Sequence, residues 1–205
     1  MYIYVKRVTD FILSVIAIVL LFPLFIVLAL WIKFDSKGPV FFKQKRIGKD
    51  RTFFHIYKFR TMLSETPSDM PTHLLDNPDA FITRSGRFLR RTSLDELPQL
   101  INILKGEMAV IGPRPALWNQ EDLADERDKY RANDVLPVLT VWAQINGRDE
   151  LPIDVKARLD GEYVKNMNFW FDVKCFFGTF LSILKSDGVV EGGTGTLEKT
   201  KKTKD

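Results

Sequence analysis

One long apolar run dominates the hydrophobic pattern of this chain. From Phe11 to Ile32 the residues are almost continuously apolar, with no charge and with Ser14 as the only polar side chain. A helix of about 20 such residues is long enough to cross a hydrocarbon core of about 30 Å. The run is too long for a typical signal-peptide core, and no small-residue cleavage site follows it. The pattern therefore predicts a membrane helix.

Pro23 lies near the middle of this run. A proline there cannot donate to the carbonyl of Val19, and its ring clashes with that turn, so we expect a kink. Basic residues flank both ends of the run, namely Lys6 and Arg7 before it and Lys33, Lys37, Lys43, Lys45 and Arg46 after it. The positive-inside bias therefore gives no orientation. Two topologies stay open: a helix that bends and returns to the cytoplasmic face, and an ordinary spanning helix with a tolerated proline.

The pattern after the apolar run predicts a β-hairpin followed by helices. Two β-prone runs, Val40–Lys43 and Thr52–Phe59, are separated by a stretch too long for a two-residue turn. A mostly polar loop with three prolines extends from Thr61 to Pro78. Leucines and isoleucines then recur at helical spacing over Arg84–Lys105. Gly112-Pro113-Arg114-Pro115 forces a turn.

Helical patterning continues in the C-terminal half. It predicts a charged surface helix over Leu117–Asn133, a helix over Asp154–Lys165 and an apolar-rich helix over Phe169–Leu184. Charged and small residues interrupt the last one, which fits an amphipathic helix lying either on the membrane interface or on the domain core. The tail from Gly192 to Asp205 is mostly Gly, Thr and Lys, and we expect it to be disordered.

Composition narrows the possible partners and sites. A chain of 205 residues leaves room for one compact domain beside a membrane segment. Its net charge of +4 favours an anionic partner, such as phosphoryl groups, anionic lipid or nucleic acid. The single cysteine, Cys175, excludes an intramolecular disulfide. His55 and His73 have no ligand-like companions in the sequence, which argues against a zinc site.

An acidic pair set among arginines, Asp95-Glu96, is the main candidate for chemistry. The arginines that lead into it are Arg84, Arg87, Arg90 and Arg91. Ser93 and Glu96 have the spacing of a capping box, which would give the pair a purely structural role. Alternatively, one carboxylate attacks phosphorus to form an acyl phosphate. Arginines and a divalent cation would then offset the repulsion from an anionic substrate, and Mg²⁺ suits carboxylate and phosphate oxygens.

Further basic side chains stand where the backbone is constrained. Arg114 lies between two prolines, so its guanidinium can be aimed with little loss of entropy. Lys58 and Arg60 occupy alternate positions at the end of a predicted strand and so share one face. The segment Trp142–Arg148 combines an aromatic ring, two amides and an arginine around a glycine. Such a set could recognise a base and a diphosphate.

In their order along the chain, these motifs resemble the bacterial sugar transferase family. The resemblance rests on Lys58–Met62, Arg90–Leu100, Leu104–Met108, Gly112–Pro115 and Trp142–Arg148, and it continues through Leu159-Asp160 and Tyr163-Val164. With one membrane segment, the chain is similar to the small monotopic phosphoglycosyl transferases of that family. It departs from the family at Phe22, where serine is common before the proline, and at Val138 and Val141, where glycine is usual.

The resemblance implies a fold class and a domain organisation. The fold would be α+β and mainly helical, with a helix-associated β-hairpin and interfacial amphipathic helices. Residues 1–34 would form a re-entrant membrane helix, residues 35–190 a transferase domain on the cytoplasmic face of the bacterial cytoplasmic membrane, and residues 191–205 a disordered tail.

The resemblance also implies a two-step reaction. In the family, the Asp of the acidic pair attacks the β-phosphate of a UDP-sugar, releases UMP and keeps the phosphosugar. Polyprenyl (undecaprenyl) phosphate then accepts it. Carried over, Asp95 is the nucleophile and a Mg²⁺ contact, and Glu96 is its partner, as a metal-site or acid–base group. Candidate phosphate or nucleotide contacts are Lys58, Arg90, Arg114 and Arg148. The implied partners are the UDP-sugar, polyprenyl phosphate and membrane lipid, without nucleic acid.

Two other functions stay open from the residues alone. A non-catalytic, membrane-anchored binder of anionic lipid or nucleic acid would need only the basic charge and the anchor. It would leave Asp95-Glu96 and the turn at Gly112–Pro115 unexplained. A transferase that acts by a single direct displacement is the other possibility. The sequence does not identify the sugar, because specificity depends on the shape of the pocket.

Overall fold

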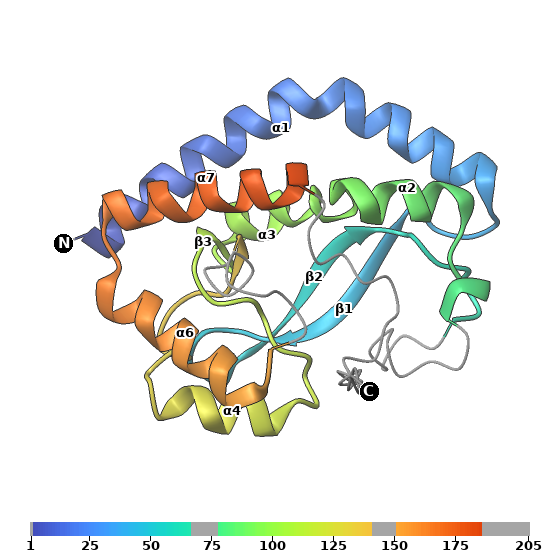
Figure 1. Cartoon of the computed structure of the whole chain (residues 1–205). Coiled ribbons are helices and arrows are strands. Elements are labelled where there is room, and N and C mark those ends of the chain that lie inside the picture. The colour runs from blue at the N-terminus through green and yellow to red at the C-terminus, as the bar shows by residue number, and fades with distance from the viewer. Residues whose placement is uncertain (1, 67–77, 141–150, 186–205) are drawn as a thin grey trace, which may run out of the picture.

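The computed structural model describes residues 2–66, 78–140 and 151–185. Its first element, α1 (Tyr2–Asp35), is one helix of 34 residues that contains the whole apolar run and Pro23. It is long and apolar enough to cross a membrane. Figure 1 shows α1 arched over the rest of the molecule, which agrees with the bend expected at Pro23. The predicted tail and the Trp142–Arg148 segment lie outside the described residues.

The predicted β-hairpin is confirmed. Strands β1 (Phe41–Ile47) and β2 (Phe53–Phe59) pair antiparallel, with Phe41 opposite Phe59 and Ile47 opposite Phe53. A short 3₁₀ turn, η1 (Lys49–Arg51), joins them, so the connection is longer than a two-residue turn. Both faces of β2 contribute to the core: Phe54 and Ile56 are buried in one cluster, and Phe59, on the opposite face, is buried in another.

The helical pattern over Arg84–Lys105 is confirmed, as two α-helices with a break between them. After a 3₁₀ turn, η3 (Pro78–Ala80), the chain forms α2 (Arg84–Thr92), a second 3₁₀ turn, η4 (Leu94–Glu96), and α3 (Gln99–Lys105). The break is at Ser93, which has a left-handed backbone with φ of 56°. A left-handed residue ends an α-helix, so the acidic pair begins a new turn.

A second pair of strands was not predicted. Strand β3 (Ala109–Ile111) pairs parallel with β4 (Val138–Thr140), and α4 (Glu121–Asp128) lies between them in the chain. Helix α4 is shorter than the predicted Leu117–Asn133, because turns follow it from residue 129 onward. Val138 has a strand conformation and is buried against Ala109, so valine replaces the usual glycine there without a left-handed backbone.

The last two helices confirm their predictions. Helix α6 (Ile153–Asn166) is followed closely by α7 (Phe169–Lys185). One side of α7 enters the core, where Cys175 packs with Tyr163 and Ile111. The other side exposes apolar side chains, namely Phe169, Trp170, Phe176 and Phe177. Packing on the domain core is therefore confirmed for one face of α7, and contact of its exposed apolar face with a membrane stays a prediction.

The inner side of α1 belongs to the hydrophobic core along most of its length. Before Pro23, Ala17 and Ile18 pack against a cluster on β2, α3 and the segment that follows α3: Phe54, Ile56, Leu100, Ile103 and Met108. After Pro23, Leu28 and Ile32 are buried with Phe59 of β2 and Leu89 of α2. The two halves of α1 therefore pack on the same domain.

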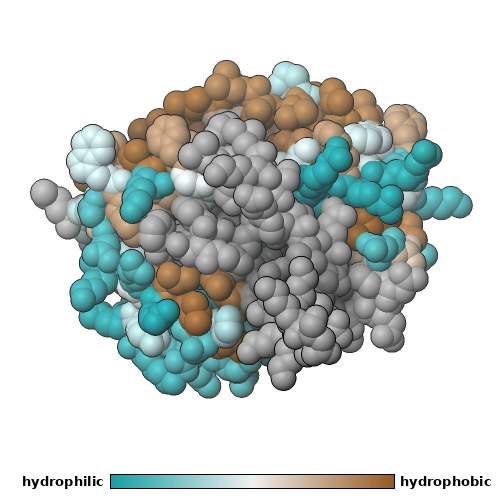
Figure 2. Space-filling model, in the orientation of Figure 1, coloured by the Kyte–Doolittle hydropathy of each residue, from teal (hydrophilic) through white to brown (hydrophobic). Residues whose placement is uncertain are grey.

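The outer side of α1 is apolar and exposed. Its exposed side chains include Ile12, Leu13, Ile16, Val19, Leu20, Phe22, Ile26, Val27, Leu30 and Phe34. Figure 2 shows the resulting hydrophobic band along the top of the molecule over α1, with hydrophilic side chains gathered below it. An apolar surface of this extent on a folded chain marks a membrane or protein contact.

Hydrogen bonds between α1 and the rest of the domain fix both ends of the helix. Near its start, the Arg7 Nη1 donates to the Ile103 carbonyl at 2.6 Å. At its end, the Asp35 carboxylate accepts from the backbone N and the hydroxyl of Ser85, at 2.9 and 2.7 Å, at the start of α2. The buried Arg60 guanidinium donates to the carbonyls that follow the last turn of α1. These bonds satisfy backbone groups that a helix end otherwise leaves unpaired.

Candidate active site

The acidic pair lies in a short turn held against the membrane helix. Leu94 and Leu97, on either side of the pair, pack against the buried cluster that includes Leu28 and Ile32 of α1. These apolar contacts hold η4 in place, and Asp95 is 8% exposed. The hydrophobic flanks of the turn thus join the acidic pair to the core that the second half of α1 helps to form.

Glu96 binds two cations from distant parts of the chain. Its Oε1 lies 2.7 Å from Lys58 Nζ of β2 and 3.1 Å from Arg114 Nη2. Lys58 Nζ is 3.9 Å from Asp95 Oδ2, which is too long for a hydrogen bond. Glu96 is therefore the tightly paired carboxylate. Asp95 is buried beside the same cations, at a longer distance from Lys58.

This arrangement separates the pKa values of the two carboxyl groups. Burial raises the pKa of Asp95 to about 6, and the negative charge of Glu96 adds to the increase, against the opposing charges of Lys58, Arg90 and Arg114. Burial alone would also raise the pKa of Glu96, but the cations of Lys58 and Arg114 outweigh it and lower the pKa to about 2. Near neutral pH, both groups carry their negative charge.

Arg90 approaches the pair from α2. Its Nε donates to the hydroxyl of Thr61 at 2.9 Å, and its charge lowers the pKa of Asp95. Thr61 also accepts from the backbone N of Thr83 at 3.0 Å, the residue that caps the start of α2. The residues after β2 therefore fix both the beginning of α2 and the direction of the Arg90 side chain.

The turn that carries Arg114 is held by backbone hydrogen bonds on both sides of that residue. The Pro113 carbonyl accepts from Val138 N at 2.9 Å. The Pro115 carbonyl accepts from the Arg46 Nη1 of β1 at 3.1 Å, and the Ala116 carbonyl accepts from Ile47 N at 2.9 Å. These bonds fix the turn, residues 112–116, in the position from which Arg114 contacts Glu96.

The structure gathers most of the predicted site residues. Asp95, Glu96, Lys58, Arg90 and Arg114 form one cluster from β2, α2, η4 and the 112–116 turn. Arg148 lies outside the described residues, so its role stays a prediction.

Two sequence interpretations of this region are wrong. In the described part of the chain, the Ser93 side chain makes no capping hydrogen bond, so the capping box does not form. Its Glu96 partner instead binds Lys58 and Arg114. Arg60, which was expected to share a face with Lys58, turns away to the end of α1, where it binds Ser36 and Lys37 carbonyls.

Sequence reasoning missed Thr61 and Arg46 as supports of the site. Thr61 directly follows Lys58-Phe59-Arg60, so its place in that motif was an available signal. Arg46 had no local signal, because its contact with the Pro115 carbonyl joins residues 69 positions apart.

The cluster offers oxygen ligands to a metal ion only through its acidic pair. Among residues 2–66, 78–140 and 151–185, no group of three or more His, Cys, Asp or Glu side chains gathers to hold a metal. Mg²⁺ is commonly bound by one or two carboxylates together with substrate phosphates. Asp95, whose carboxylate is less tied than that of Glu96, fits such a shared site.

Comparisons with known proteins identify the family of this chain. The family model described as bacterial sugar transferase matches residues 1–186. A Bacillus subtilis protein named uncharacterized sugar transferase EpsL is 39% identical over 199 residues, which cover 95% of this chain and 94% of that protein.

Two further relatives are longer than this chain. UDP-glucose:undecaprenyl-phosphate glucose-1-phosphate transferase of Escherichia coli is 39% identical over 85% of this chain and 39% of its own length. UDP-N-acetylgalactosamine-undecaprenyl-phosphate N-acetylgalactosaminephosphotransferase of Aeromonas hydrophila is 38% identical over 91% of this chain and 45% of its own length. This chain therefore spans less than half of either enzyme. The family match over nearly the whole chain shows that it belongs to the bacterial sugar transferase family.

Proposed function

We propose that the chain is a phosphoglycosyl transferase that moves a sugar 1-phosphate from a UDP-sugar to polyprenyl phosphate through a covalent intermediate on Asp95. The observation that carries the proposal is the division of labour within the acidic pair. Glu96 holds Lys58 and Arg114, and Asp95 stays beside these cations without a hydrogen bond to Lys58. The names of the undecaprenyl-phosphate transferases among its relatives support the same donor and acceptor classes.

In the first step, an Asp95 carboxylate oxygen attacks the β-phosphorus of the UDP-sugar. The bond from that phosphorus to the oxygen bridging the two phosphates breaks, UMP leaves with the electron pair, and an aspartyl phosphosugar forms. Lys58, Arg90 and Arg114 carry positive charge where the diphosphate must lie, and they offset its repulsion from the carboxylate. Splitting one displacement into two easier ones is the gain of covalent catalysis.

In the second step, a phosphate oxygen of polyprenyl phosphate attacks the same phosphorus. The bond from phosphorus to Asp95 breaks, the carboxylate is restored, and a polyprenyl-diphosphate sugar is released. Because the pKa of Glu96 is about 2, this residue stays ionised throughout. We therefore assign Glu96 the task of orienting Lys58 and Arg114, instead of transferring a proton.

A Mg²⁺ ion fits this proposal as a group held by Asp95 and by the substrate phosphates. It would supply positive charge that lowers the repulsion between the carboxylate and the diphosphate. Removal of divalent cations with a chelator should abolish UMP release, and added Mg²⁺ should restore it.

The test of the reaction is UMP release from a panel of UDP-sugars, with glucose, galactose and N-acetylated amino sugars as donors. We expect turnover by the wild type and none by Asp95→Asn. Asp134→Asn, which changes an exposed aspartate paired with Arg131, is the matched control and should keep full activity. Equal turnover by Asp95→Asn would remove Asp95 as the nucleophile. A folded wild type that releases no UMP from any donor would favour the non-catalytic binder.

The intermediate is tested without the acceptor. Incubation with the donor alone should add one phosphosugar to Asp95, detectable by mass spectrometry of peptides. Transfer to polyprenyl phosphate with no label on Asp95 would favour a single direct displacement.

We also propose that α1 is re-entrant and that the site lies on the cytoplasmic face of the membrane. Support comes from the two ends of α1, since Arg7 binds the Ile103 carbonyl and Asp35 binds Ser85 of the same domain. A bilayer between the two ends would separate one of them from its partners. The exposed outer side of α1 would then lie in the lipid.

Cysteine accessibility tests this topology. Tyr4 is 80% exposed near the start of α1, and Lys37 is exposed after its end. In a Cys175→Ser background, Tyr4→Cys and Lys37→Cys should both resist a membrane-impermeant thiol reagent in intact cells and react after permeabilisation. Labelling of Tyr4→Cys in intact cells would mean that α1 spans the membrane.

A further inference from the structure

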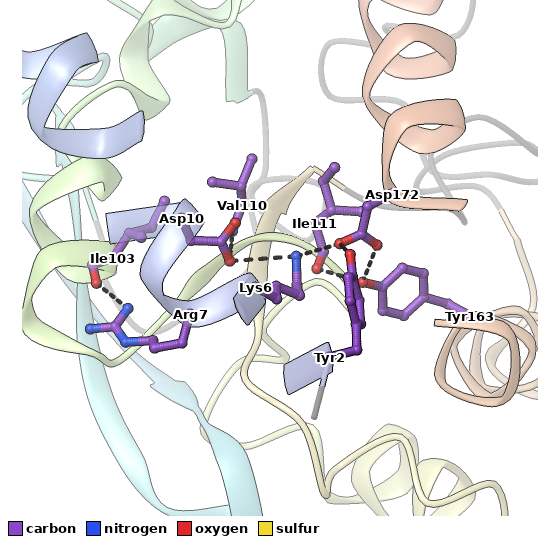
Figure 3. A network of polar contacts seen from close by, with 9 residues as sticks. All are labelled: Tyr2, Lys6, Arg7, Asp10, Ile103, Val110, Ile111, Tyr163 and Asp172. Atoms are coloured by element: carbon purple, nitrogen blue, oxygen red, sulfur yellow. Dashed lines mark hydrogen bonds and ion pairs between the residues drawn. The ribbon is translucent and has the colours of Figure 1, made fainter. Parts of the chain in front are cut away.

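A polar network joins the first turns of α1 to α7 and to β3 (Figure 3). The Asp172 Oδ2 of α7 accepts from the hydroxyl of Tyr2 and from Lys6 Nζ, both at 2.7 Å. Lys6 also pairs with Asp10 at 3.4 Å, and Asp10 accepts from the backbone N of Val110 in β3 at 3.3 Å. The network is thus a fixed connection between the start of the membrane helix and the domain.

Tyr163 of α6 connects this network to Ile111, which directly precedes the 112–116 turn. Its hydroxyl lies 2.7 Å from Asp172 Oδ1 and 2.9 Å from the Ile111 carbonyl, and the residue is 1% exposed. Burial and the neighbouring Asp172 raise the pKa of Tyr163, so the hydroxyl keeps its proton. A hydroxyl has one proton, so the two acceptors share it in a three-centre bond.

The Tyr163 ring also limits the space at the next residue, Gly112. A Cβ on Gly112 would lie 3.4 Å from Tyr163 Cε1 and 2.7 Å from Val138 Cγ1. Gly112 has φ of 156°, a conformation that residues with a side chain rarely adopt. The backbone at Ile111 and Gly112 is therefore confined from two sides, by the Tyr163 ring and hydroxyl and by Val138.

Ile111 and Gly112 form the entry to the turn that carries Arg114. Arg46 holds the exit of the same turn through the Pro115 carbonyl. Between these two anchors, Arg114 reaches Glu96 at 3.1 Å. A shift of the entry would therefore move the guanidinium relative to the acidic pair.

We propose that Tyr163 is a positioning residue that holds the entry of the 112–116 turn, keeps Arg114 in place beside Glu96, and ties this turn through Asp172 to the start of α1. Its effect on catalysis rests on the proposed transferase function. Its effect on the turn does not, which allows the two to be tested apart.

The matched pair for the test is Tyr163→Phe and Tyr2→Phe. Each variant removes one hydroxyl from the same Asp172 carboxylate, but only Tyr163→Phe removes the contact with the Ile111 carbonyl. Hydrogen–deuterium exchange should rise in residues 109–116 of Tyr163→Phe and stay at the wild-type level there in Tyr2→Phe. Exchange in the β1–β2 hairpin should not change in either protein.

Three exchange results would overturn the proposal. The first is wild-type exchange at residues 109–116 in Tyr163→Phe. The second is an equal rise there in Tyr2→Phe. The third is a rise across the whole of Tyr163→Phe, because the hydroxyl would then support the fold in general and not this turn.

The kinetic test asks whether Tyr163 acts through Arg114. Tyr163→Phe should lower kcat/KM for UMP release about tenfold, the size expected for one lost hydrogen bond. In an Arg114→Gln background, the same change should cost less than twofold, since residues that act together are not additive. A full tenfold loss in both backgrounds would contradict action through Arg114. If the wild type releases no UMP, the proposed function fails, and the exchange result alone decides whether Tyr163 positions the turn.

Discussion

Asp95 and Glu96 are adjacent in the chain, yet their surroundings move their pKa values in opposite directions. Glu96 takes the close contacts with Lys58 and Arg114, and its pKa falls to about 2. Asp95 is left with burial as the largest influence, and its pKa rises to about 6. A carboxylate with a raised pKa is a stronger base and a better nucleophile once it is ionised, so the pairing of Glu96 with the cations favours attack by Asp95.

The raised pKa of Asp95 predicts an acidic limb in the pH profile. The nucleophile must be ionised, so kcat/KM for UMP release should fall as the pH drops through about 6. Lys58→Met removes a charge that lowers this pKa, so the limb should move to higher pH. Glu96→Gln removes a negative neighbour and frees two cations for Asp95, so the limb should move to lower pH.

The control for these shifts is Lys129→Met, which changes an exposed lysine that pairs with Glu126 and does not belong to the cluster around the acidic pair. Its profile should match that of the wild type. Shifts of the same sign in Lys58→Met and Glu96→Gln would contradict the assignment of the limb to Asp95.

At the scale of elements, the end of α1 depends on one buried side chain. Arg60 donates to the Ser36 carbonyl at 2.8 Å, to the Lys37 carbonyl and to Ser64 Oγ at 2.9 Å. Arg60→Gln removes these donated bonds and leaves the Ser36 carbonyl without its guanidinium partner, and we expect a loss of about 2 kcal/mol of unfolding free energy. Arg60→Lys should restore little, because an ammonium group cannot span the same acceptors.

Thermal unfolding in detergent micelles checks this expectation. Arg131→Gln is the matched control, since Arg131 is an exposed arginine that pairs with the nearby Asp134, and its melting temperature should equal that of the wild type. An unchanged melting temperature in Arg60→Gln would show that the carbonyls at the end of α1 find water instead.

Contact between α2 and the end of β2 depends on the absence of a side chain at Gly86. A Cβ there would lie 2.0 Å from the Thr61 carbonyl oxygen. Alanine normally stabilises a helix relative to glycine, but here we expect Gly86→Ala to cost about 1–3 kcal/mol and to displace Arg90 from Thr61. Gly48→Ala, whose Cβ would meet the Phe54 ring at the longer distance of 3.1 Å, should cost less. Chemical denaturation of both variants provides the comparison, and equal stability would contradict the close packing.

The elements that the sequence predicted well are those defined by local pattern. The apolar run, the alternating hairpin strands and the spacing in α6 and α7 each carry their signal within a few turns. The capping-box spacing indicated a helix boundary at Ser93, but the left-handed backbone there had no sequence signal, because no glycine marks it. Strands β3 and β4 have three residues each and are separated in the chain by 26 residues, from Ile111 to Val138 at their nearest ends, so no local pattern reveals them.

The site follows the same rule. The acidic pair and its basic neighbours could be chosen from the sequence, since charged residues stand out in ordered motifs. Their partners could not, because Lys58 and Arg114 meet at Glu96 only after the hairpin and the 112–116 turn have folded. Arg60 shows the limit most clearly: its place beside Lys58 in the strand suggested a shared role, and the packing of α1 gives it another.

At the scale of the whole molecule, α1 and α7 both expose apolar side chains. Trp170 is 76% exposed on α7, whereas Trp118 lies beside Lys45 of β1. If α7 lies on the bilayer, brominated lipids in nanodiscs should quench the fluorescence of Trp170. Trp170→Phe should then remove much of the quenched signal, and Trp118→Phe should leave it unchanged. Equal losses in the two variants would contradict a membrane contact of α7.

The burial of the inner side of α1 has a practical consequence for the design of a water-soluble variant of this protein. Leu28 and Ile32 are 3% and 1% exposed, so deleting the helix would expose the core that they fill and leave η4, which carries the acidic pair, without support. A soluble form therefore requires that α1 be kept and that apolar side chains on its outer surface be replaced by polar ones. Polar substitutions at outward positions such as Val19, Leu20 and Phe22, each at least 60% exposed, would remove the affinity for lipid while keeping the half of the helix that the domain needs.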